Sequence, residues 1–285
     1  MNNYIFQRLL RTYRSKGLKG LSSSIFNYLG RKLNPKHVGE FPFKYLFLKK
    51  RRLIKKFGEK YLDKLDDKNI IPFGNYPLKS NNINSDSIIY TFGIGTSLHF
   101  EEKLSQAFQC KVFCYDPTDC AVVFMRDRDY DKKLINFFEY GIWINDEKVK
   151  FYSQNIDAKN PGGSITNLFN NSEFKLFQCH KLSSLMKMNN HDKIDILKMD
   201  IEGAAFDVLH NILDEKILPN QIAVEFEFSE MKFDEFDEDD FNIWAKKLKD
   251  LILKFRLNDY KCYNLPRYSH FPYSTTEVLF VKKSS

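Results

Sequence analysis

The chain has 285 residues, of which 43% are hydrophobic and 28% charged, so it can bury a sizeable core and is not a disordered chain. No apolar stretch approaches the roughly 18 residues of a transmembrane helix, and the first residues lack the apolar stretch of a secretory signal. Five cysteines are too few for a disulfide scaffold, so we expect reduced thiols and a cytoplasmic protein.

The formal net charge of +7 is distributed unevenly along the chain. Residues 1–80 hold 19 basic and 5 acidic side chains, whereas residues 81–285 hold 25 and 32. We therefore expect a basic helical extension over residues 1–80, followed by a separate domain over residues 81–285. Basic amphipathic helices bind anionic lipid surfaces, so residues 1–66 are a candidate for peripheral membrane contact. Simple packing of these helices on the domain is the other interpretation.

The elements are expected in the following order. Helices are expected within residues 1–33 and over 44–66, where apolar side chains fall on one face, and the Asn-, Pro- and Gly-containing segment 69–87 is expected to be a linker. Apolar runs then predict strands at 88–92, 111–115, 137–144, 149–152, 193–200, 222–228, 260–263 and 277–281. Helices are predicted at 98–108, 119–127, 182–188, 204–213 and 241–255, with a polar loop at 155–172.

This alternation of strands and helices predicts an α/β fold with a doubly wound, mostly parallel sheet. The end of the pattern differs, because a helix, a strand, a loop and a strand follow one another. We therefore expect one antiparallel strand at the end of the sheet.

Ligands of open α/β sheets bind beyond the carboxyl ends of the strands. Gly93 and Gly95 follow the first predicted strand of the domain, and glycine there allows a tight turn and the close approach of a ligand. Asp116 follows the next strand about 20 residues later, where a carboxylate can accept hydrogen bonds from ribose hydroxyls. Simpler interpretations exist for both. The glycines could form an ordinary strand-to-helix turn, and Asp116, which precedes Pro117, could cap the next helix.

Acidic residues also follow the later strands. Lys198, Asp200 and Glu202 leave the strand at 193–200 together, and Glu225 follows the next strand, with Glu227 on the same face if that strand continues. Such carboxylates can orient a hydroxyl, assist its deprotonation or bind a cation. Asp200 and Glu225, on neighbouring strands, are expected to form a close pair that shares a proton or, given a third oxygen ligand, holds a divalent metal. Capping of the next helix is the simpler interpretation for Asp200 and Glu202. No metal-spaced histidine or cysteine motif occurs in the sequence, so no metal ligands are assigned.

Together these segments resemble the FkbM-type family of S-adenosylmethionine-dependent methyltransferases, over about residues 86–228. The stretches that match are YTFGIGTSLHFEE, CKVFCYDPT, FFEYGIW, GGSITNL, HDKIDILKMDIEGAAFDVL and QIAVEFEF. The resemblance implies a Rossmann-like class I methyltransferase fold, with helices on both faces of a seven-stranded sheet whose last strand is inserted antiparallel. It also implies S-adenosylmethionine as the cofactor.

The resemblance carries over to individual residues. The residues it places at the cofactor are Thr91, Phe92, Gly93, Gly95, Thr96, Asp116, Pro117, Gly141, Ile142 and Asp200. Many relatives carry an acid at the position of Thr91, so recognition of the cofactor's amino group is expected to differ here. Asp200 is expected nearest the acceptor, with Glu202 or Glu225 as its helper. The expected substrate contacts are Ser164, Asn167 and Lys198.

The expected reaction is a direct displacement in which an acceptor oxygen attacks the sulfonium methyl while the protein removes the hydroxyl proton. The resemblance implies a role in surface-polysaccharide or natural-product biosynthesis, and hence a sugar hydroxyl on a glycan or lipid-linked glycan as acceptor. One alternative is a nucleic-acid methyltransferase that uses the basic extension, although the sequence shows no nucleic-acid-binding module. The other is a non-catalytic Rossmann protein with a membrane- or partner-binding extension.

Overall fold

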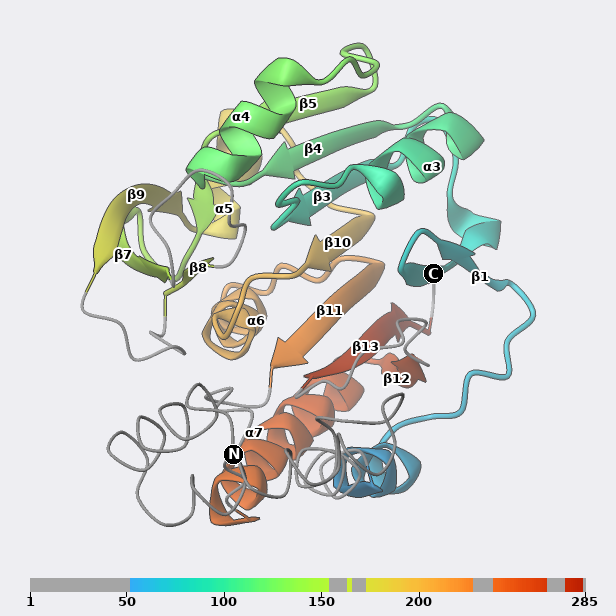
Figure 1. Cartoon of the computed structure of the whole chain (residues 1–285). Helices are drawn as coiled ribbons and strands as arrows, with labels where there is room; N and C mark the ends of the chain where they lie inside the picture. Colours follow the sequence, from blue (N-terminus) through green and yellow to red (C-terminus); the bar gives the residue numbers. More distant parts are fainter. Residues whose placement is uncertain (1–51, 154–162, 166–172, 228–237, 266–274, 284–285) are drawn as a thin grey trace, which may run out of the picture. The chain divides into compact units, whose positions relative to one another are not determined.

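The structure is a computed structural model that describes residues 52–153, 163–165, 173–227, 238–265 and 275–283 (Figure 1). Residues 54–231 and 237–285 form one compact unit, and the other unit, residues 1–53 and 232–236, falls almost wholly outside the described residues. The helices predicted within residues 1–33, and the first part of the one predicted over 44–66, also lie outside them. Residues 52–61 are helical, with Phe57 buried on the predicted apolar face.

A seven-stranded sheet in the order β12-β13-β11-β10-β3-β4-β5 forms the centre of the larger unit (Figure 1). Its strands are β3 (Ile88–Phe92), β4 (Lys111–Tyr115), β5 (Ile135–Phe138), β10 (Ile196–Met199), β11 (Gln221–Glu227), β12 (Tyr260–Leu265) and β13 (Thr275–Lys282). The pairings from β5 to β11 are parallel, whereas β13 pairs antiparallel with both β11 and β12. The predicted mostly parallel seven-stranded sheet with one inserted antiparallel strand is confirmed.

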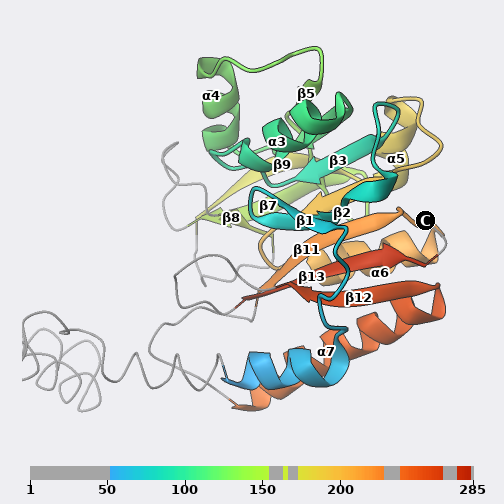
Figure 2. The same cartoon turned by 90° about the vertical axis from the view of Figure 1, so that its right-hand side faces the viewer.

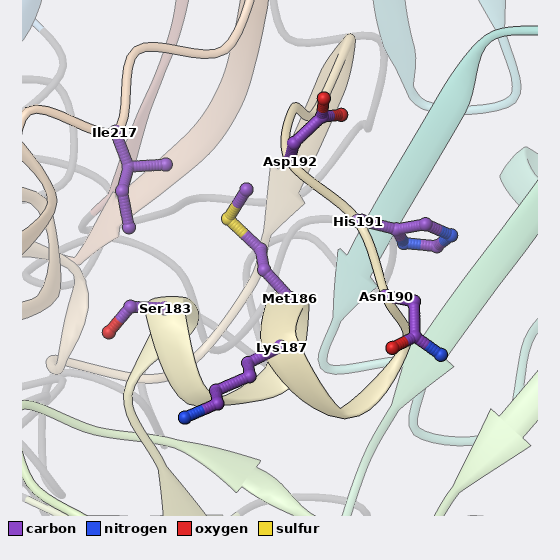
Figure 3. A pocket seen from close by; sticks show the side chains of 7 residues that line it. All are labelled: Ser183, Met186, Lys187, Asn190, His191, Asp192 and Ile217. Carbon is purple, nitrogen blue, oxygen red and sulfur yellow. The ribbon is translucent and has the colours of Figure 1, made fainter.

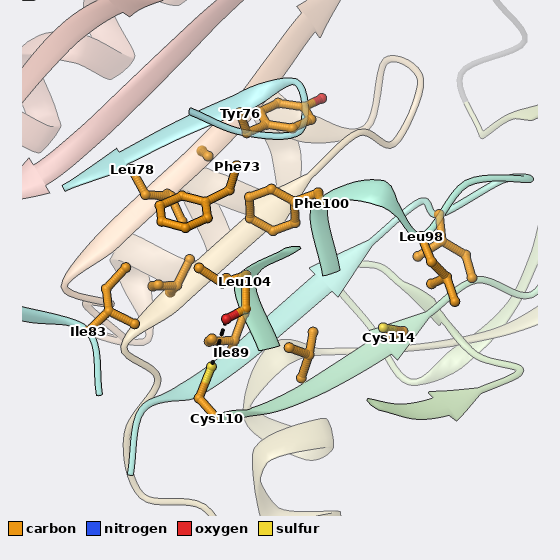
Figure 4. Packing of buried hydrophobic residues seen from close by; sticks show 14 of the residues in the cluster. Phe73, Tyr76, Leu78, Ile83, Ile89, Leu98, Phe100, Leu104, Cys110 and Cys114 are labelled. Atoms are coloured by element: carbon orange, nitrogen blue, oxygen red, sulfur yellow. Dashed lines mark hydrogen bonds between the residues drawn. The ribbon is translucent and has the colours of Figure 1, made fainter. Parts of the chain in front are cut away.

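Helices cover both faces of this sheet, as predicted. On one face lie α3 (His99–Phe108) and α4 (Asp119–Asp127), whose apolar side chains share a core with alternate residues of the strands; Figure 4 shows Leu104 of α3 near Ile89 of β3. On the other face lie α5 (Leu182–Met188), α6 (Ala205–Asp214) and α7 (Glu238–Leu257). Among the described residues no helix is both long and apolar enough to cross a bilayer.

The linker predicted over residues 69–87 is wrong, because this segment contains a hairpin. Strands β1 (Ile70–Phe73) and β2 (Tyr76–Lys79) pair antiparallel across the two residues Gly74 and Asn75, and the short 3-10 helix η1 (Ser80–Asn82) follows. Phe73, Tyr76 and Leu78 are buried, and they pack near Phe100 of α3 (Figure 4). Strand β1 contacts α3, and β2 contacts β11 and β13, so the hairpin covers part of the main sheet (Figure 2).

A second sheet corrects another prediction. The single strand predicted over 137–144 is wrong, because β5 ends at Phe138 in the main sheet and the next strand belongs to a four-stranded sheet, β6-β9-β7-β8. Its strands are β6 (Gly141–Ile142), β7 (Glu147–Ser153), β8 (Gly163–Ser164) and β9 (Phe174–His180). Strand β9 was not predicted, since it is half-exposed and polar residues interrupt its apolar ones. The polar loop predicted over 155–172 lies mostly outside the described residues.

Candidate active site

The glycine turn after β3 lies directly against the end of β10. A Cβ atom on Gly93 would lie 1.8 Å from the carbonyl oxygen of Asp200, and the φ angle of Gly93 is +75°. Both observations require glycine at this position, because a side chain would collide with the backbone and would disfavour this φ. The turn predicted to hold the cofactor is therefore set by the packing of two neighbouring strand ends.

Asp116 at the end of β4 braces the same turn. Its Oδ2 accepts hydrogen bonds from the backbone N–H groups of Ile94 (3.1 Å) and Gly95 (2.9 Å). Its Oδ1 accepts hydrogen bonds from the backbone N–H and the hydroxyl of Thr118. Burial raises the pKa of Asp116, an effect that these four hydrogen bonds oppose. The carboxylate is thus engaged with the turn in this conformation, and a ribose would have to share it with the turn.

The other residues predicted at the cofactor lie around this turn in different settings. Thr91 and Phe92 are buried within β3, where the Phe92 ring stacks on Tyr115 of β4 at a centroid distance of 4.9 Å. Thr96 is exposed beyond the turn. Gly141 lies beside Pro117, since a Cβ built on Gly141 would be 3.4 Å from the Pro117 side chain, and Ile142 is buried next to it.

Carboxylates gather where β10 and β11 end. Oxygen atoms of Asp200, Glu202 and Glu227 lie within 4.8 Å of one another. Glu227 is only 7% exposed: its Oε2 accepts a 2.7 Å hydrogen bond from the Gly203 backbone N–H, while its Oε1 is buried without a hydrogen-bond partner among the described residues. Burial raises the pKa of Glu227 well above its usual value, and the charges of Glu202, Asp200 and Glu225 raise it further.

The backbone of the turn between β10 and α6 is held in an uncommon conformation. Glu202 has a φ of +33°, which is unusual for a residue with a side chain, and Gly203 has a φ of +82°. The buried hydroxyl of Ser164, on β8, donates a 2.7 Å hydrogen bond to the Glu202 carbonyl oxygen. Ser164 therefore reaches the acidic turn from the second sheet. Asn167 lies outside the described residues.

Tyr76 is a site residue that the sequence did not reveal. Its hydroxyl donates a 3.2 Å hydrogen bond to Oδ2 of Asp200, a residue 124 positions away in the chain. The side chain is buried, and burial raises the pKa of Tyr76 well above its usual value, with further contributions from Asp200, Glu225 and Glu277. Glu277 stands directly opposite Glu225 in the pairing of β11 with β13. The sequence gives no signal of this contact, because the two residues are far apart in the chain and the segment that carries Tyr76 is predicted to be a linker.

Lys198 connects the glycine turn to the acidic residues. Its buried Nζ donates a 2.6 Å hydrogen bond to the carbonyl oxygen of Gly93 and lies 3.9 Å from Oδ2 of Asp200. The same ammonium group lies 5.3 Å from the centroid of the Tyr76 ring. Glu101 of α3 is also buried; burial raises its pKa and the charge of Lys198 opposes this effect. Lys198 was predicted to contact the substrate, whereas its ammonium here faces the backbone of the turn.

A surface hollow lies at the opposite end of the main sheet (Figure 3). It is lined by Ser183, Met186, Lys187, Asn190, His191, Asp192 and Ile217. These residues come from α5, from the loop that leads into β10, and from the segment between α6 and β11, all at the amino ends of the strands. The residues that line the hollow include none of those predicted for the site, so we assign the candidate active site to the carboxyl ends of β3, β4, β10 and β11.

Comparison with known proteins gives a family match and distant structural similarities. Residues 66–262 match the family model described as the methyltransferase FkbM domain. Similar solved structures include an O-methyltransferase from Bacillus cereus in complex with SAH (9% identity, 99% of this chain and 92% of that chain covered, TM-score 0.38). They also include the fibrillarin pre-rRNA processing protein of Methanococcus jannaschii (9% identity, 70% and 68% covered, TM-score 0.41). No curated protein matches the chain.

The family match spans the parts of the chain that build the site. It begins before the β1–β2 hairpin and ends within β12, so it includes the glycine turn, Asp116 and the acidic residues after β10 and β11. The strand order, with β13 inserted antiparallel, agrees with the fold that the sequence predicted for this family. The chain therefore belongs to the FkbM family of S-adenosylmethionine-dependent methyltransferases.

Proposed function

We propose that this enzyme transfers the methyl group of S-adenosylmethionine to a hydroxyl of a sugar or glycan. The observation that carries the proposal is the group of carboxylates at the ends of β10 and β11, beside the glycine turn. Sugar hydroxyls are hydrogen-bond donors that carboxylates can accept, and they are poor acids that need help to lose a proton. A neutral polyhydroxyl acceptor suits this environment better than an anionic one.

The residues of the site fit the proposed cofactor. S-adenosylmethionine supplies an activated methyl group on a positively charged sulfur atom. The turn at Gly93 and Gly95 would hold its polar end close to the backbone, and Asp116 would hold its ribose. Thr96, Pro117, Gly141 and Ile142 lie around the same turn, and the carboxylates after β10 would favour a nearby positive charge.

Within this proposal Asp200 is the catalytic carboxylate. Tyr76 donates a hydrogen bond to its Oδ2, and Lys198 lies within 3.9 Å of the same atom, so the side chain is held in one orientation. Asp200 would orient the acceptor hydroxyl and accept its proton, with Glu202 or Glu225 as helper. Ser164 would act by fixing the turn that carries Glu202.

The same carboxylates argue against a nucleic-acid acceptor. A phosphate backbone carries one negative charge per nucleotide and is normally held by Lys and Arg, whereas this site presents several acids. Most of the basic residues that would serve this alternative fall within residues 1–51, outside the described residues. In the proposal, residues 1–66 instead contact an anionic membrane from the cytoplasmic side and bring the enzyme to a lipid-linked acceptor. Flotation with anionic and neutral vesicles tests that contact, and recovery in the bottom fraction with both would contradict it.

The experiment for the acceptor uses the full chain with isotopically labelled S-adenosylmethionine and three acceptor classes: neutral glycans, lipid-linked glycans and RNA. We expect label in a methyl ether on a sugar. Asp200→Asn should lower kcat about 100-fold to 10,000-fold, the usual contribution of a positioned proton acceptor. Asp207→Asn is the matched control, because Asp207 is an exposed acid in the first turn of α6. Label in RNA but in neither glycan class would overturn the proposal.

A further inference from the structure

We propose that Asp200, Glu202 and Glu227 form a binding site for an oxygen-preferring divalent cation such as Mg²⁺, Mn²⁺ or Ca²⁺. The existence of this site is independent of the acceptor, whereas the role given to the ion below rests on the proposed methyl transfer to a hydroxyl. The three side chains come from two adjacent parallel strands: Asp200 and Glu202 follow β10, and Glu227 ends β11.

The spacing of the three carboxylates suits such an ion. Their oxygen atoms lie within 4.8 Å of one another. Two oxygens on opposite sides of one ion lie about 4.0–4.2 Å apart around Mg²⁺ and about 4.6–5.2 Å apart around Ca²⁺. An ion between these side chains could therefore be reached by all three with small side-chain movements.

Glu227 provides an independent reason to expect a ligand. Its Oε2 is held by the Gly203 backbone N–H at 2.7 Å, so the carboxylate has a fixed position. The side chain is more than nine-tenths buried, and its Oε1 has no hydrogen-bond partner among the described residues. A buried carboxylate oxygen without a partner is costly, and a cation among the three carboxylates would supply the missing contact.

The charges near the cluster leave room for a cation. Glu225 lies on the same strand as Glu227, and its charge also acts on that carboxyl group. Lys198 is the basic side chain beside Asp200, but its ammonium group donates at 2.6 Å to the carbonyl oxygen of Gly93 and stays 3.9 Å from the Asp200 oxygen. Three neighbouring carboxylates, of which Glu227 is buried and the other two are partly exposed, are stabilised when a divalent ion balances their charge.

The backbone also holds the cluster in place before any ligand arrives. Glu202 keeps a φ of +33°, and its carbonyl oxygen is bound by the hydroxyl of Ser164 at 2.7 Å. Backbone conformations of this kind persist where the surrounding structure over-determines them, and they occur often at ligand sites. The three carboxylates are thus arranged by the fold rather than by flexible surface loops.

The ion would have a defined chemical role in the proposed reaction. Protein carboxylates leave some positions of the ion open, and an acceptor hydroxyl bound at one of them would lose its proton more easily. The electron pair of the acceptor oxygen forms the new carbon–oxygen bond, and the electrons of the broken carbon–sulfur bond stay on sulfur. Because Asp200 would then be bound to the ion, the released proton would pass to a carboxylate outside the three ligands instead, and Glu225 on β11 is the candidate.

The test measures cation binding directly. The full chain is freed of metal with a chelator and titrated with Mn²⁺, and free Mn²⁺ is followed by electron paramagnetic resonance. We expect one Mn²⁺ per chain, and at least a tenfold weaker Kd in Glu227→Gln, which keeps the Gly203 hydrogen bond through its amide oxygen. Glu202→Gln should weaken binding similarly, so the test does not depend on one variant folding well. Asp207→Asn, with the same loss of charge at an exposed position of α6, should bind as the native chain does.

The outcomes separate this site from the proposed function. Lack of saturable binding of Mn²⁺, Mg²⁺ or Ca²⁺ at millimolar concentration, in a chain that still binds S-adenosylmethionine, would overturn the site and leave the methyl transfer untouched. Unchanged Mn²⁺ affinity in both Glu227→Gln and Glu202→Gln would also overturn it. Mn²⁺ binding that depends on Glu227, together with failure to methylate any glycan, would support the site and contradict the proposed acceptor.

Discussion

The two ends of the central sheet differ in how their polar groups are paired. At the amino ends of the strands, Asp195 accepts hydrogen bonds from the Ile88 backbone N–H (2.8 Å) and from the Asn220 amide (2.9 Å). Asn189 donates to the Tyr90 hydroxyl at 2.9 Å, and this hydroxyl also bonds to the His191 ring at 2.8 Å. These polar groups bind one another, as is usual for buried polar atoms.

The carboxyl ends of the strands show the opposite arrangement. Like charges meet there, and Oε1 of Glu227 is buried without a partner among the described residues. Such features cost free energy in the protein without ligand. The amino edge of the sheet therefore stabilises the fold, whereas the carboxyl edge is arranged for ligands. Substitutions at the two edges should consequently differ in whether they lower stability, activity or both.

The largest effect is expected for Gly93→Ala. The added Cβ would lie 1.8 Å from the Asp200 carbonyl oxygen at a φ of +75°, so the turn must move. Overpacking and the left-handed conformation together predict a loss of about 2–4 kcal/mol in the free energy of unfolding, and we expect at least tenfold weaker binding of S-adenosylmethionine by calorimetry.

Gly58→Ala is the matched control for this substitution. Its Cβ would lie 2.6 Å from the amide nitrogen of Asn264, which is the end of a flexible side chain, and Gly58 has no positive φ. We expect its stability to change by less than about 1 kcal/mol, with unchanged cofactor binding. Native stability and affinity in Gly93→Ala would show that the turn is malleable and would contradict our account of it.

At the amino edge, Asn189→Ala should reduce stability without reducing activity. It removes an amide that bonds to the buried hydroxyls of Tyr90 and Tyr115, and the loss should be about 1–3 kcal/mol by urea denaturation. The methyl-transfer rate at saturating substrate should stay native at a temperature where the variant is folded. The control is Asn145→Ala, an exposed residue, with a change within about 0.5 kcal/mol. A loss of activity in folded Asn189→Ala would show that the two edges are coupled.

Tyr76→Phe tests the contact between the hairpin and the carboxyl edge. Loss of the hydrogen bond to Asp200 should lower kcat about tenfold and stability by about 1 kcal/mol, because the ring keeps its packing. The Kd for S-adenosylmethionine should be unchanged, since Tyr76 acts through Asp200; a purely structural role would not produce this separation. Tyr140→Phe, at an exposed tyrosine, serves as control. A native kcat in Tyr76→Phe would remove Tyr76 from the site.

The smallest effect concerns pH and His191. Burial lowers the pKa of His191, and the nearby charge of Lys111 lowers it further. The unfolded chain therefore protonates His191 more readily than the folded chain does. The contribution of neutral His191 to the free energy of unfolding is complete above about pH 6.5 and is lost as the pH falls below that value. Because the ring is only partly buried, the loss should stay below about 1 kcal/mol.

The measurement for His191 compares native and His191→Gln chains by urea denaturation above and below that pH. Buried acids such as Glu101, whose pKa is raised by burial, change stability in the opposite direction, so only the difference between the two chains reports on the histidine. We expect this difference to shrink on acidification. A difference that does not change with pH would show that His191 is equally neutral or equally charged in both states.

Much of the fold could be predicted because the central strands are buried on both faces. Strands such as β3 and β10 are mostly apolar, with one polar residue each, and they stand out between amphipathic helices and polar turns. Strands β1 and β9 are half-exposed, whereas β2 is buried but only four residues long, and Pro, Lys or Gln stand among the apolar residues of these strands. The Gly74-Asn75 pair between two short apolar segments is typical of a hairpin turn. The many Asn, Ser, Pro and Gly residues of segment 69–87 nevertheless favoured a linker over a hairpin.

The candidate site was predictable where it follows strand ends, and not where it depends on distances across the fold. Gly93, Asp116 and Asp200 could be named because each comes directly after a strand. The sequence suggested Asp200 with Glu225 as the close pair of acids, whereas the cluster with closely spaced oxygens consists of Asp200, Glu202 and Glu227. Tyr76 could not be found at all, because only the folded hairpin brings it to Asp200. The catalytic and substrate roles of these residues stay predictions.

The position of β13 has a consequence for how the enzyme is made. This strand is the seventh of the main sheet in chain order, yet it lies between β11 and β12 and brings Glu277 opposite Glu225. While the chain is being synthesised, the edge of β11 must stay open, and β12 has no place in the sheet, until residues 275–282 have left the ribosome. A growing chain can therefore form the glycine turn early, but it completes the acidic edge only after β13 has emerged.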